Sequence, residues 1–268
     1  MKAIILAAGR GSRMRQLTDE RPKCLVPLQG RALLDWQLEA LRLGGASEIA
    51  VVTGYRRECL ADRGLVEFHN PHWARTNMVS SLACAQEWLG SEACLVSYSD
   101  LFYQPSAVRL LAASSAPLAI TYDPAWRALW EARFDDPLSD AETFRVSADG
   151  QLLEIGQRPT QIEAIQGQYM GLLRFTPSAW AELLRVRQLL DDSQCDALHM
   201  TGALQAIIQA GRQEVLAIPY RGLWGEIDSS QDLQASVSLA ERFAQAFAGE
   251  RQGLGSYASA GQRSDSRA

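Results

Sequence analysis

Short apolar runs alternate with amphipathic stretches along the first 120 residues of the chain. The runs typical of buried strands are KAIILAA (2–8), EIAVVTG (48–54), LVEFHN (65–70) and ACLVSYSD (93–100). The stretches between them have helical periodicity: LLDWQLEALRLGG (33–45), RRECLADRG (56–64) and MVSSLACAQEWLG (78–90). Strands that alternate with helices at this spacing predict crossover connections and a largely parallel sheet. Ligands of such a sheet bind at the carboxyl ends of its strands.

The rhythm changes between residues 121 and 170, where FRV and GQLLEIGQR predict antiparallel strands around a turn at Asp149 and Gly150. The core pattern then resumes with a strand (167–176), two helices (177–192, 200–211), a strand (214–220) and a closing helix (228–247) capped by Asp228 or Ser229. We therefore expect one α/β domain over residues 1–248. Its mixed, mostly parallel sheet is flanked by helices and carries a small antiparallel insertion at about 121–170. Residues 249–268 have no periodicity and predict a flexible tail.

The composition excludes several classes of protein. With 47% hydrophobic and 21% charged residues, the chain has the makeup of a soluble globular protein. A net charge of -5 without a dense Lys/Arg block argues against nucleic-acid binding, and no apolar run approaches the ~20 residues of a membrane span. The scattered cysteines indicate reduced thiols rather than a zinc site or a disulfide framework, so we expect a cytoplasmic protein: Cys24, Cys59, Cys84, Cys94 and Cys195.

The first apolar run leads into a loop of small residues. Their backbone amides can approach phosphate closely, with Arg10, Arg13 and Arg15 adding charge, and the residues are Ala7, Ala8, Gly9, Gly11 and Ser12. A P-loop needs Gly-Lys-Ser/Thr, whereas Ser12 and Arg13 follow Gly11 here. A dinucleotide fingerprint needs a third glycine where Met14 stands. The loop predicts a polyphosphate site, although small residues can also form no more than a tight turn.

Lys23 follows this loop by ten residues and stands between Pro22 and an apolar stretch. A lone lysine is usually a solvated surface group. Beside an arginine-rich phosphate loop, however, an ammonium group can clamp the charge that develops on a phosphate.

These residues carry a family resemblance. The segment LAAGRGSRMRQLTDERPKCLVPLQGRALLDWQLEAL (6–41) resembles the signature of the NTP-transferase superfamily, LAAGxGxRM/L followed by PKxL. It is most similar to the small cytidylyltransferases of the phosphocholine and phosphonoalkyl type. The similarity continues in NPHWARTNMVSSLACA (70–85), SYSDLFY (97–103), GQYMGLLRF (167–175), MTGALQAIIQAG (200–211) and WGEIDSSQDLQAS (224–236).

The resemblance implies a Rossmann-like nucleotidyltransferase that uses Mg²⁺ and transfers a cytidylyl group from CTP, with release of pyrophosphate. The implied acceptor is a small phosphorylated or phosphonate compound of the phosphocholine, phosphoethanolamine or 2-aminoethylphosphonate type. We expect Asp100 and Asp228 to ligate the metal, although either could be a turn or cap residue. Lys23 and Arg13 would hold the triphosphate and carry the catalysis.

The resemblance also implies a nucleotide site and an acceptor site. The nucleotide site would comprise the phosphate loop, including Ser12, with Leu6, Ala7, Ala8, Gly9, Gly11, Asn77 and Ser80; Asn77 could equally cap a helix. A cationic head group would be held by aromatic faces and carboxylates from Trp224, Glu226, Trp130 and Glu142, and the insertion would cover this side. Most tryptophans are nevertheless core residues. Gly202 stands where the family often has an acid, and His69, His72 and His199 receive no catalytic role.

Two other functions stay open on the sequence alone. A sugar-1-phosphate uridylyl- or guanylyltransferase would share the same phosphate-binding residues. A non-catalytic nucleotide-binding regulator is a second alternative, but Lys23, Asp100 and Asp228 together argue against it. The sequence leaves open whether the donor is CTP or UTP, how many metal ions act, and whether the chain forms a homodimer.

Overall fold

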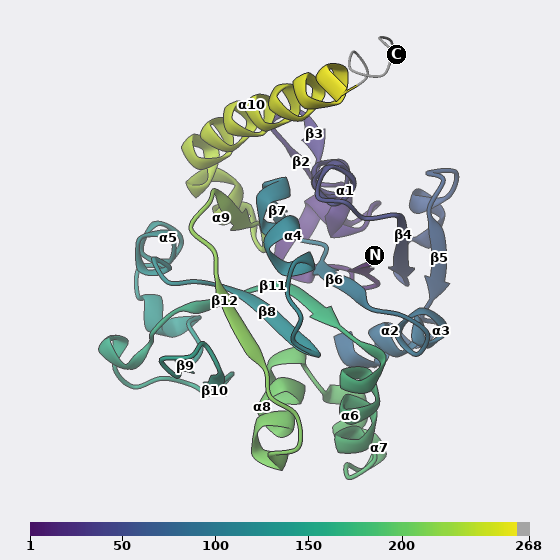
Figure 1. The fold of residues 1–268 in the computed structure, drawn as a ribbon, viewed down its shortest axis with the longest axis vertical. Coiled ribbons are helices and arrows are strands. Elements are labelled where there is room, and N and C mark those ends of the chain that lie inside the picture. Colours follow the sequence, from purple (N-terminus) through teal and green to yellow (C-terminus); the bar gives the residue numbers. More distant parts are fainter. Residues whose placement is uncertain (262–268) are drawn as a thin grey trace.

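A seven-stranded sheet forms the centre of the computed structural model, which describes residues 1–261 and the side chains of residues 1–251. In spatial order its strands are β12 (Leu216–Pro219), β8 (Leu118–Asp123), β11 (Gln168–Phe175), β6 (Cys94–Tyr98), β1 (Lys2–Ala7), β4 (Glu48–Thr53) and β5 (Val66–His69). Only β11 runs antiparallel to its neighbours, β6 and β8. The predicted mixed, mostly parallel sheet is thus confirmed (Figure 1).

Helices cover both faces of this sheet. In Figure 1, α1 and α10 lie above it, while α2, α6 and α8 lie below it. The helices are α1 (Leu33–Leu43), α2 (Met78–Ala83), α3 (Gln86–Leu89), α4 (Pro105–Ala112), α5 (Arg127–Arg133), α6 (Pro177–Arg187), α7 (Asp192–Ala197), α8 (Met200–Ala210), α9 (Ser230–Ala235) and α10 (Val237–Gly261). The segment 56–64, expected as a short helix, forms only a 3-10 turn at Arg57–Leu60. Within the described residues, no helix is long and apolar enough to cross a bilayer.

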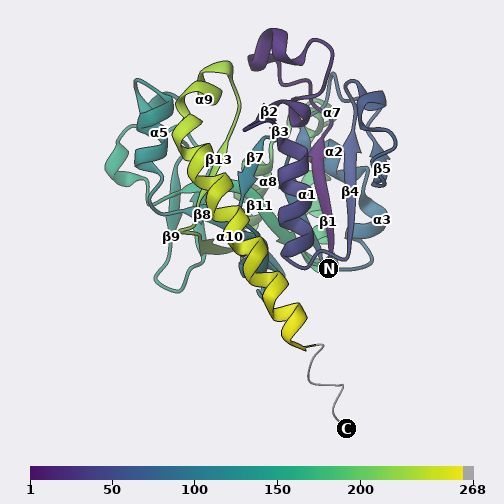
Figure 2. The same cartoon turned by 90° about the horizontal axis from the view of Figure 1, so that it is seen from above.

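The closing helix differs from the expectation. It is interrupted at Ser236, so that α9 and α10 are separate, and Ser229 rather than Asp228 caps α9. Helix α10 crosses beside α1 (Figure 2) and continues to Gly261, so residues 249–261 are helical where the sequence predicted no regular structure. Two ion pairs hold this extension, Arg109–Glu250 at 2.7 Å and Arg251–Glu39 at 2.5 Å. Residues 262–268 of the expected tail lie outside the described residues.

The insertion lies between β8 and β11. Because β8 continues to Asp123 and β11 already begins at Gln168, the insertion is shorter at both ends than the expected 121–170. It contains α5, a 3-10 turn and the antiparallel strands β9 (Phe144–Val146) and β10 (Leu152–Ile155). The predicted turn is present, with Gly150 at φ +81°. Gln205 of α8 accepts a hydrogen bond from the Ile155 N–H at 2.9 Å and anchors this hairpin to the domain.

Two further two-stranded ladders complete the fold. Strands β2 (Pro27–Leu28) and β3 (Arg31–Ala32) form a small hairpin before α1. Strand β7 (Leu101–Tyr103) pairs antiparallel with β13 (Trp224–Glu226), although more than a hundred residues separate them in the sequence. This second ladder has a direct consequence for the site.

Candidate active site

The β7–β13 ladder brings two distant aspartates together. Asp100 directly precedes β7, and Asp228 follows the end of β13 by two residues. The Ile227 N–H donates to the Asp100 carbonyl at 2.9 Å, which extends the pairing to the aspartates. Two carboxylates from distant parts of the chain therefore lie at the carboxyl ends of the strands, where ligands of parallel sheets bind.

Lys23 bridges these two carboxylates. Its Nζ donates to Asp100 Oδ2 at 2.7 Å and also to Asp228 Oδ1. The residue is only 6% exposed. Burial acts to lower the pKa of Lys23, but Asp100 and Asp228 outweigh burial and raise the pKa above its ordinary value of 10.5. The ammonium group is therefore charged throughout the physiological range, as a phosphate clamp requires.

The glycine loop is shaped by its contact with Lys23. Gly11 has φ +71°, and a Cβ there would lie 2.8 Å from both Cβ and Cδ of Lys23. Only glycine permits this backbone conformation together with so close an approach. Arg13 follows the loop and forms an ion pair with Asp228, while its side chain stays 68% exposed. Asp228 thus pairs with both the buried ammonium of Lys23 and the accessible guanidinium of Arg13.

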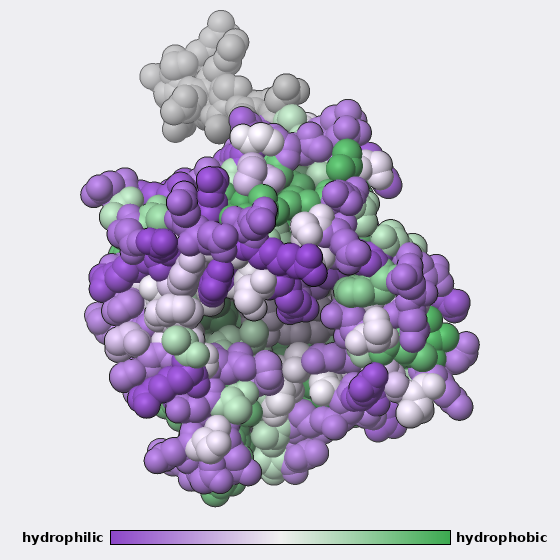
Figure 3. Space-filling model, turned by 180° about the vertical axis from the view of Figure 1, so that it is seen from behind, coloured by the Kyte–Doolittle hydropathy of each residue, from purple (hydrophilic) through white to green (hydrophobic). Residues whose placement is uncertain are grey.

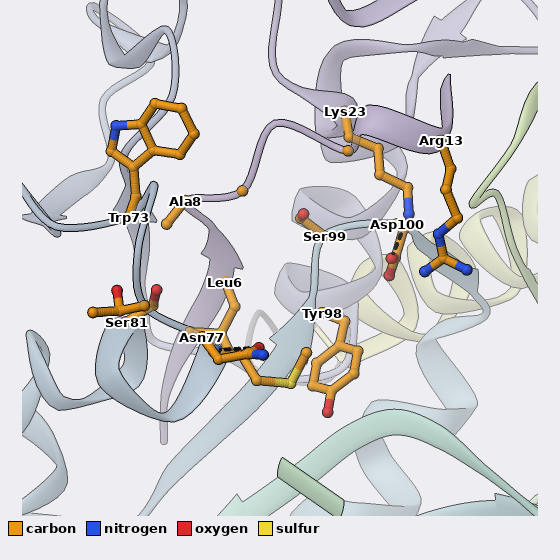
Figure 4. Close-up of a pocket in the computed structure, with 14 residues that line it drawn as sticks. Leu6, Ala8, Arg13, Lys23, Trp73, Asn77, Ser81, Tyr98, Ser99 and Asp100 are labelled. Carbon is orange, nitrogen blue, oxygen red and sulfur yellow. Dashed lines mark hydrogen bonds and ion pairs between the residues drawn. The ribbon is translucent and has the colours of Figure 1, made fainter. Parts of the chain in front are cut away.

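A first cavity of about 280 Å³ opens beside the loop. Figure 4 shows Lys23, Asp100 and Arg13 together at one side of it, and Trp73 and Ser81 at the other. Its lining residues are Leu6, Ala8, Gly9, Gly11, Arg13, Lys23, Trp73, Thr76, Asn77, Met78, Ser81, Tyr98, Ser99 and Asp100. One side is suited to a polyphosphate, and the other, lined by aromatic and hydroxyl side chains, to the rest of a nucleotide.

Three of the expected nucleotide-site residues do not line this cavity. Ala7 is buried in β1, and Ser12 is exposed at the start of the following 3-10 helix. The Ser80 hydroxyl accepts from Arg187 at 2.8 Å and donates to the Cys195 carbonyl, whereas its neighbour Ser81 lines the cavity. Asn77 caps α2, because its Oδ1 accepts from the Met78 N–H, and it also lines the cavity.

A second cavity, of about 230 Å³, adjoins the first. Arg13, Met78, Tyr98 and Asp100 line both cavities. The remaining residues of the second cavity are Trp130, Asp140, Glu142, Gln168, Tyr169, Gly171, His199, Thr201, Glu226 and Asp228. Trp130, Glu142 and Glu226, expected in an acceptor site, therefore share one wall with the expected metal ligands.

The second cavity is acidic. Burial raises the pKa of Glu142 and of Asp140, and it raises the pKa of Glu226 to about 7 even though the Arg133 guanidinium opposes that rise. Arg133 Nη2 donates to Glu226 Oε1 at 2.6 Å. Glu142 comes from the insertion and Glu226 from β13, so the insertion contributes part of the lining of this cavity.

Trp224 does not line the second cavity. It is 4% exposed, and its indole N–H donates to Asp123 Oδ2 at 2.9 Å within the core. Sequence reasoning missed the tyrosines of the site, Tyr98 and Tyr169, and also Gln168 and Thr201. The sequence pattern could have indicated Tyr98 and Tyr169, because each has a polar hydroxyl and lies near one end of a predicted strand. His199, which received no role, also lines this cavity.

The two aspartates fit a magnesium ion that is completed by a nucleotide. Asp100 Oδ1 is buried and has no hydrogen-bond partner, so the carboxylate has an oxygen free for a ligand. Among the described residues no cluster of three or more His, Cys, Asp or Glu side chains could enclose a metal. Magnesium typically takes one or two carboxylates together with substrate phosphates and waters, rather than a closed protein cage.

Comparison with known proteins identifies the family. Residues 3–148 match the model of the MobA-like NTP transferase domain. The CTP:phosphoglutamine cytidylyltransferase of Campylobacter jejuni is 34% identical over 253 residues, which are 88% of this chain and 99% of that protein. The chain belongs to the MobA-like NTP transferase family. It is accordingly a nucleotidyltransferase, and the resemblance seen in the sequence is confirmed.

Three further similar proteins extend the comparison. The 2-aminoethylphosphonate cytidylyltransferase of Lancefieldella rimae is 34% identical over 104 residues, 37% of this chain and 42% of that protein. The solved inositol-1-phosphate CTP transferase of T. maritima superposes with a TM-score of 0.71 at 22% identity, over 90% of this chain and 95% of that one. CTP:phosphocholine cytidylyltransferase of Streptococcus pneumoniae gives a TM-score of 0.66 at 20% identity, over 89% and 98%. These two structures share the fold.

Proposed function

We propose that the chain transfers a cytidylyl group from CTP to the phosphate or phosphonate oxygen of a small acceptor and releases pyrophosphate. The observation that carries this proposal is the pair of adjoining cavities with Arg13 and Asp100 in their common wall. A relative matched over nearly its full length is named for CTP and a small phosphorylated acceptor. The relatives from L. rimae and S. pneumoniae are named for cytidylyl transfer to similar compounds.

The reaction needs positioning and positive charge more than it needs a base. An acceptor oxygen forms a bond to the α-phosphorus of CTP, while the bond from that phosphorus to the bridging oxygen breaks and pyrophosphate leaves. Because the acceptor phosphate is already ionised at neutral pH, no side chain has to remove a proton. Lys23 and Arg13 hold the triphosphate and stabilise the charge that moves onto the leaving pyrophosphate.

Asp100 and Asp228 would hold the magnesium ion. When bound, the ion supplies further neutralisation of phosphate charge. Lys23 contacts the same two carboxylates and so ties the metal site to the phosphate loop. The nucleotide would extend from these charges toward Asn77, Ser81 and the backbone of Leu6 and Ala8.

The test measures pyrophosphate release with each of the four NTPs, with and without Mg²⁺. The acceptor panel comprises phosphocholine, phosphoethanolamine, 2-aminoethylphosphonate, phosphoglutamine and several sugar 1-phosphates. We expect release with CTP, Mg²⁺ and one of the first four acceptors. Preference for UTP or GTP with a sugar 1-phosphate would establish the alternative transferase, and nucleotide binding without release from any pair would establish a regulator.

The metal ligands are tested by Asp100→Asn and Asp228→Asn. We expect each to reduce release at saturating CTP by about 100-fold or more. Calorimetric titration of CTP in the presence of Mg²⁺ should show weakened binding, whereas CTP binding without the metal should change much less. Asp149→Asn, at the turn of the insertion, is the control. Full activity of both site variants would contradict the proposed ligands.

A further inference from the structure

Glu142 is held rigidly at the wall of the second cavity. The Gln168 side chain clamps its backbone, accepting from the Glu142 N–H at 3.1 Å and donating to the Glu142 carbonyl at 2.6 Å. Thr201 donates to Glu142 Oε1 at 3.2 Å. This carboxylate is therefore placed by three hydrogen bonds from β11 and α8, two of them to its backbone.

The hydrogen bonding of the other Glu142 carboxylate oxygen, Oε2, differs from that of Oε1. Within residues 1–251 it makes no hydrogen bond, and no Lys, Arg or His lies within ion-pair distance of Glu142. This oxygen does not belong to the buried side-chain atoms that lack a partner, so it is open to the cavity and can accept a hydrogen bond from a ligand. The cavity thus lacks a hydrogen-bond donor at this position.

Tyr169 and Trp130 bring two further polar groups to this cavity. The Tyr169 hydroxyl and the Trp130 indole nitrogen are both buried, and both lack a hydrogen-bond partner among the described side chains. Both residues line the second cavity. Buried polar groups are normally paired. The Trp130 indole N–H can only donate and calls for an acceptor oxygen on a ligand, whereas the Tyr169 hydroxyl can also accept from a ligand N–H.

The tryptophans, in contrast, offer little surface for a cation. Trp130 is only 4% exposed, and the Arg133 guanidinium already lies 5.2 Å from its ring centre. Trp126 packs edge-on against it with ring centres 5.9 Å apart, and Trp224 lies behind it at 6.4 Å. A cage for a quaternary ammonium needs accessible aromatic faces. These tryptophans are buried and pack against one another and against Arg133.

We propose that the acceptor carries an N–H donor, a primary amine or an amide, which hydrogen-bonds to Glu142, and that the cavity selects against a trimethylammonium group. The inference rests on the proposed function and specifies its acceptor class. A trimethylammonium group has the same charge as a primary ammonium but has no proton to donate.

An N-methylation series tests the acceptor class at constant charge. The series is phosphoethanolamine, its N-methyl and N,N-dimethyl forms, and phosphocholine, each assayed with CTP and Mg²⁺. We expect kcat/KM to fall along the series by at least about tenfold in total, because a charged hydrogen bond is lost. A compound that is not turned over is ranked by its inhibition constant against an acceptor that is. If phosphoethanolamine neither reacts nor inhibits, the same comparison uses N-methylated forms of the acceptor that reacts.

The variant Glu142→Gln tests whether Glu142 causes the preference for acceptors with fewer N-methyl groups. We expect this variant to lose most of the preference between the ends of the series, while its melting temperature and its KM for CTP stay close to those of the parent. Glu154→Gln is the matched control, because Glu154 lies in the same insertion and pairs with Arg145 away from the cavity. Equal or better use of the trimethylated acceptor by the parent would overturn the inference. Absence of pyrophosphate release with every NTP and acceptor would instead overturn the proposed function.

Discussion

Arg133 Nε donates to Asp232 Oδ1 at 2.9 Å, in an ion pair whose two side chains are 1% and 3% exposed. Asp232 in turn accepts from the N–H groups of Asp228 at 3.0 Å and Ser229 at 2.8 Å. The same guanidinium donates to Glu226. Helix α5 of the insertion therefore fixes the backbone on which a proposed metal ligand stands.

Replacing Arg133 by Met should destabilise the fold by about 3–5 kcal/mol, because it leaves buried carboxylates without their cation. Urea unfolding measures this change. Arg127→Met is the matched control on the same helix, since Arg127 forms an exposed pair with Glu131, and such pairs contribute less than about 1 kcal/mol. Identical unfolding midpoints for the two variants would show that the Arg133 ion pairs do not stabilise the fold by this amount.

Lys23→Met should reduce kcat/KM for CTP by about 100-fold or more, since it removes a preorganised charge from the phosphate site. Pyrophosphate release at varied CTP measures the loss. Lys2 is the other lysine of the chain, and its partners Glu48 and Glu92 lie at the surface, so Lys2→Met serves as control. A Lys23→Met protein within threefold of the parent would refute the assigned role.

Gly11→Ala should impair both stability and activity, whereas Gly30→Ala should impair stability alone. The two glycines have nearly the same φ, +71° and +73°, so alanine costs each about 1 kcal/mol of backbone strain. Only at Gly11 would the added Cβ meet Lys23; at Gly30 there is nothing within 4 Å. Thermal unfolding and steady-state kinetics of both variants separate strain from displacement of Lys23. Equal kinetic effects would mean that the contact is unimportant.

The thiols should react in an order set by their surroundings. Burial raises the pKa of Cys24 to about 12 and that of Cys94 to about 11. Because the thiolate is the nucleophile, these two should resist iodoacetamide at pH 8, and only a small rise in their labelling is expected up to pH 9. Half-buried Cys59 and Cys195 should be modified before the two buried thiols. Peptide mass spectrometry of the native and urea-unfolded protein measures the rates; rapid labelling of native Cys24 would contradict the structure.

Local patterns predicted much of this molecule. The strand periodicity gave most of the sheet, and the small-residue loop with Lys23 behind it gave the charged side of the first cavity. Asp100 and Asp228 were expected to act together, but only the family resemblance linked them. Their physical link is the β7–β13 ladder, which depends on pairing between distant segments that no local pattern encodes.

The details that the sequence analysis placed wrongly also depend on contacts between distant segments. Ser80 and Ser81 are adjacent on α2, and which of the two faces the cavity depends on packing against Arg187 of another helix. Trp224 is next to the proposed site in sequence, yet its indole N–H turns to Asp123 in the core. The helical extension beyond Gly249 has little periodicity of its own and relies on ion pairs with α4 and α1.

The surface is hollowed near the middle of the face shown in Figure 3, with hydrophilic and hydrophobic side chains around the hollow. The two cavities share the lining residues Arg13, Met78, Tyr98 and Asp100. The proposed sites for donor and acceptor are therefore not separated from each other. Adjoining cavities allow the proposed donor and acceptor to be bound at the same time, and we expect each to contact the residues that the other also contacts. Steady-state rates measured against both substrates should give intersecting rather than parallel reciprocal plots, the kinetic signature of direct transfer within a ternary complex.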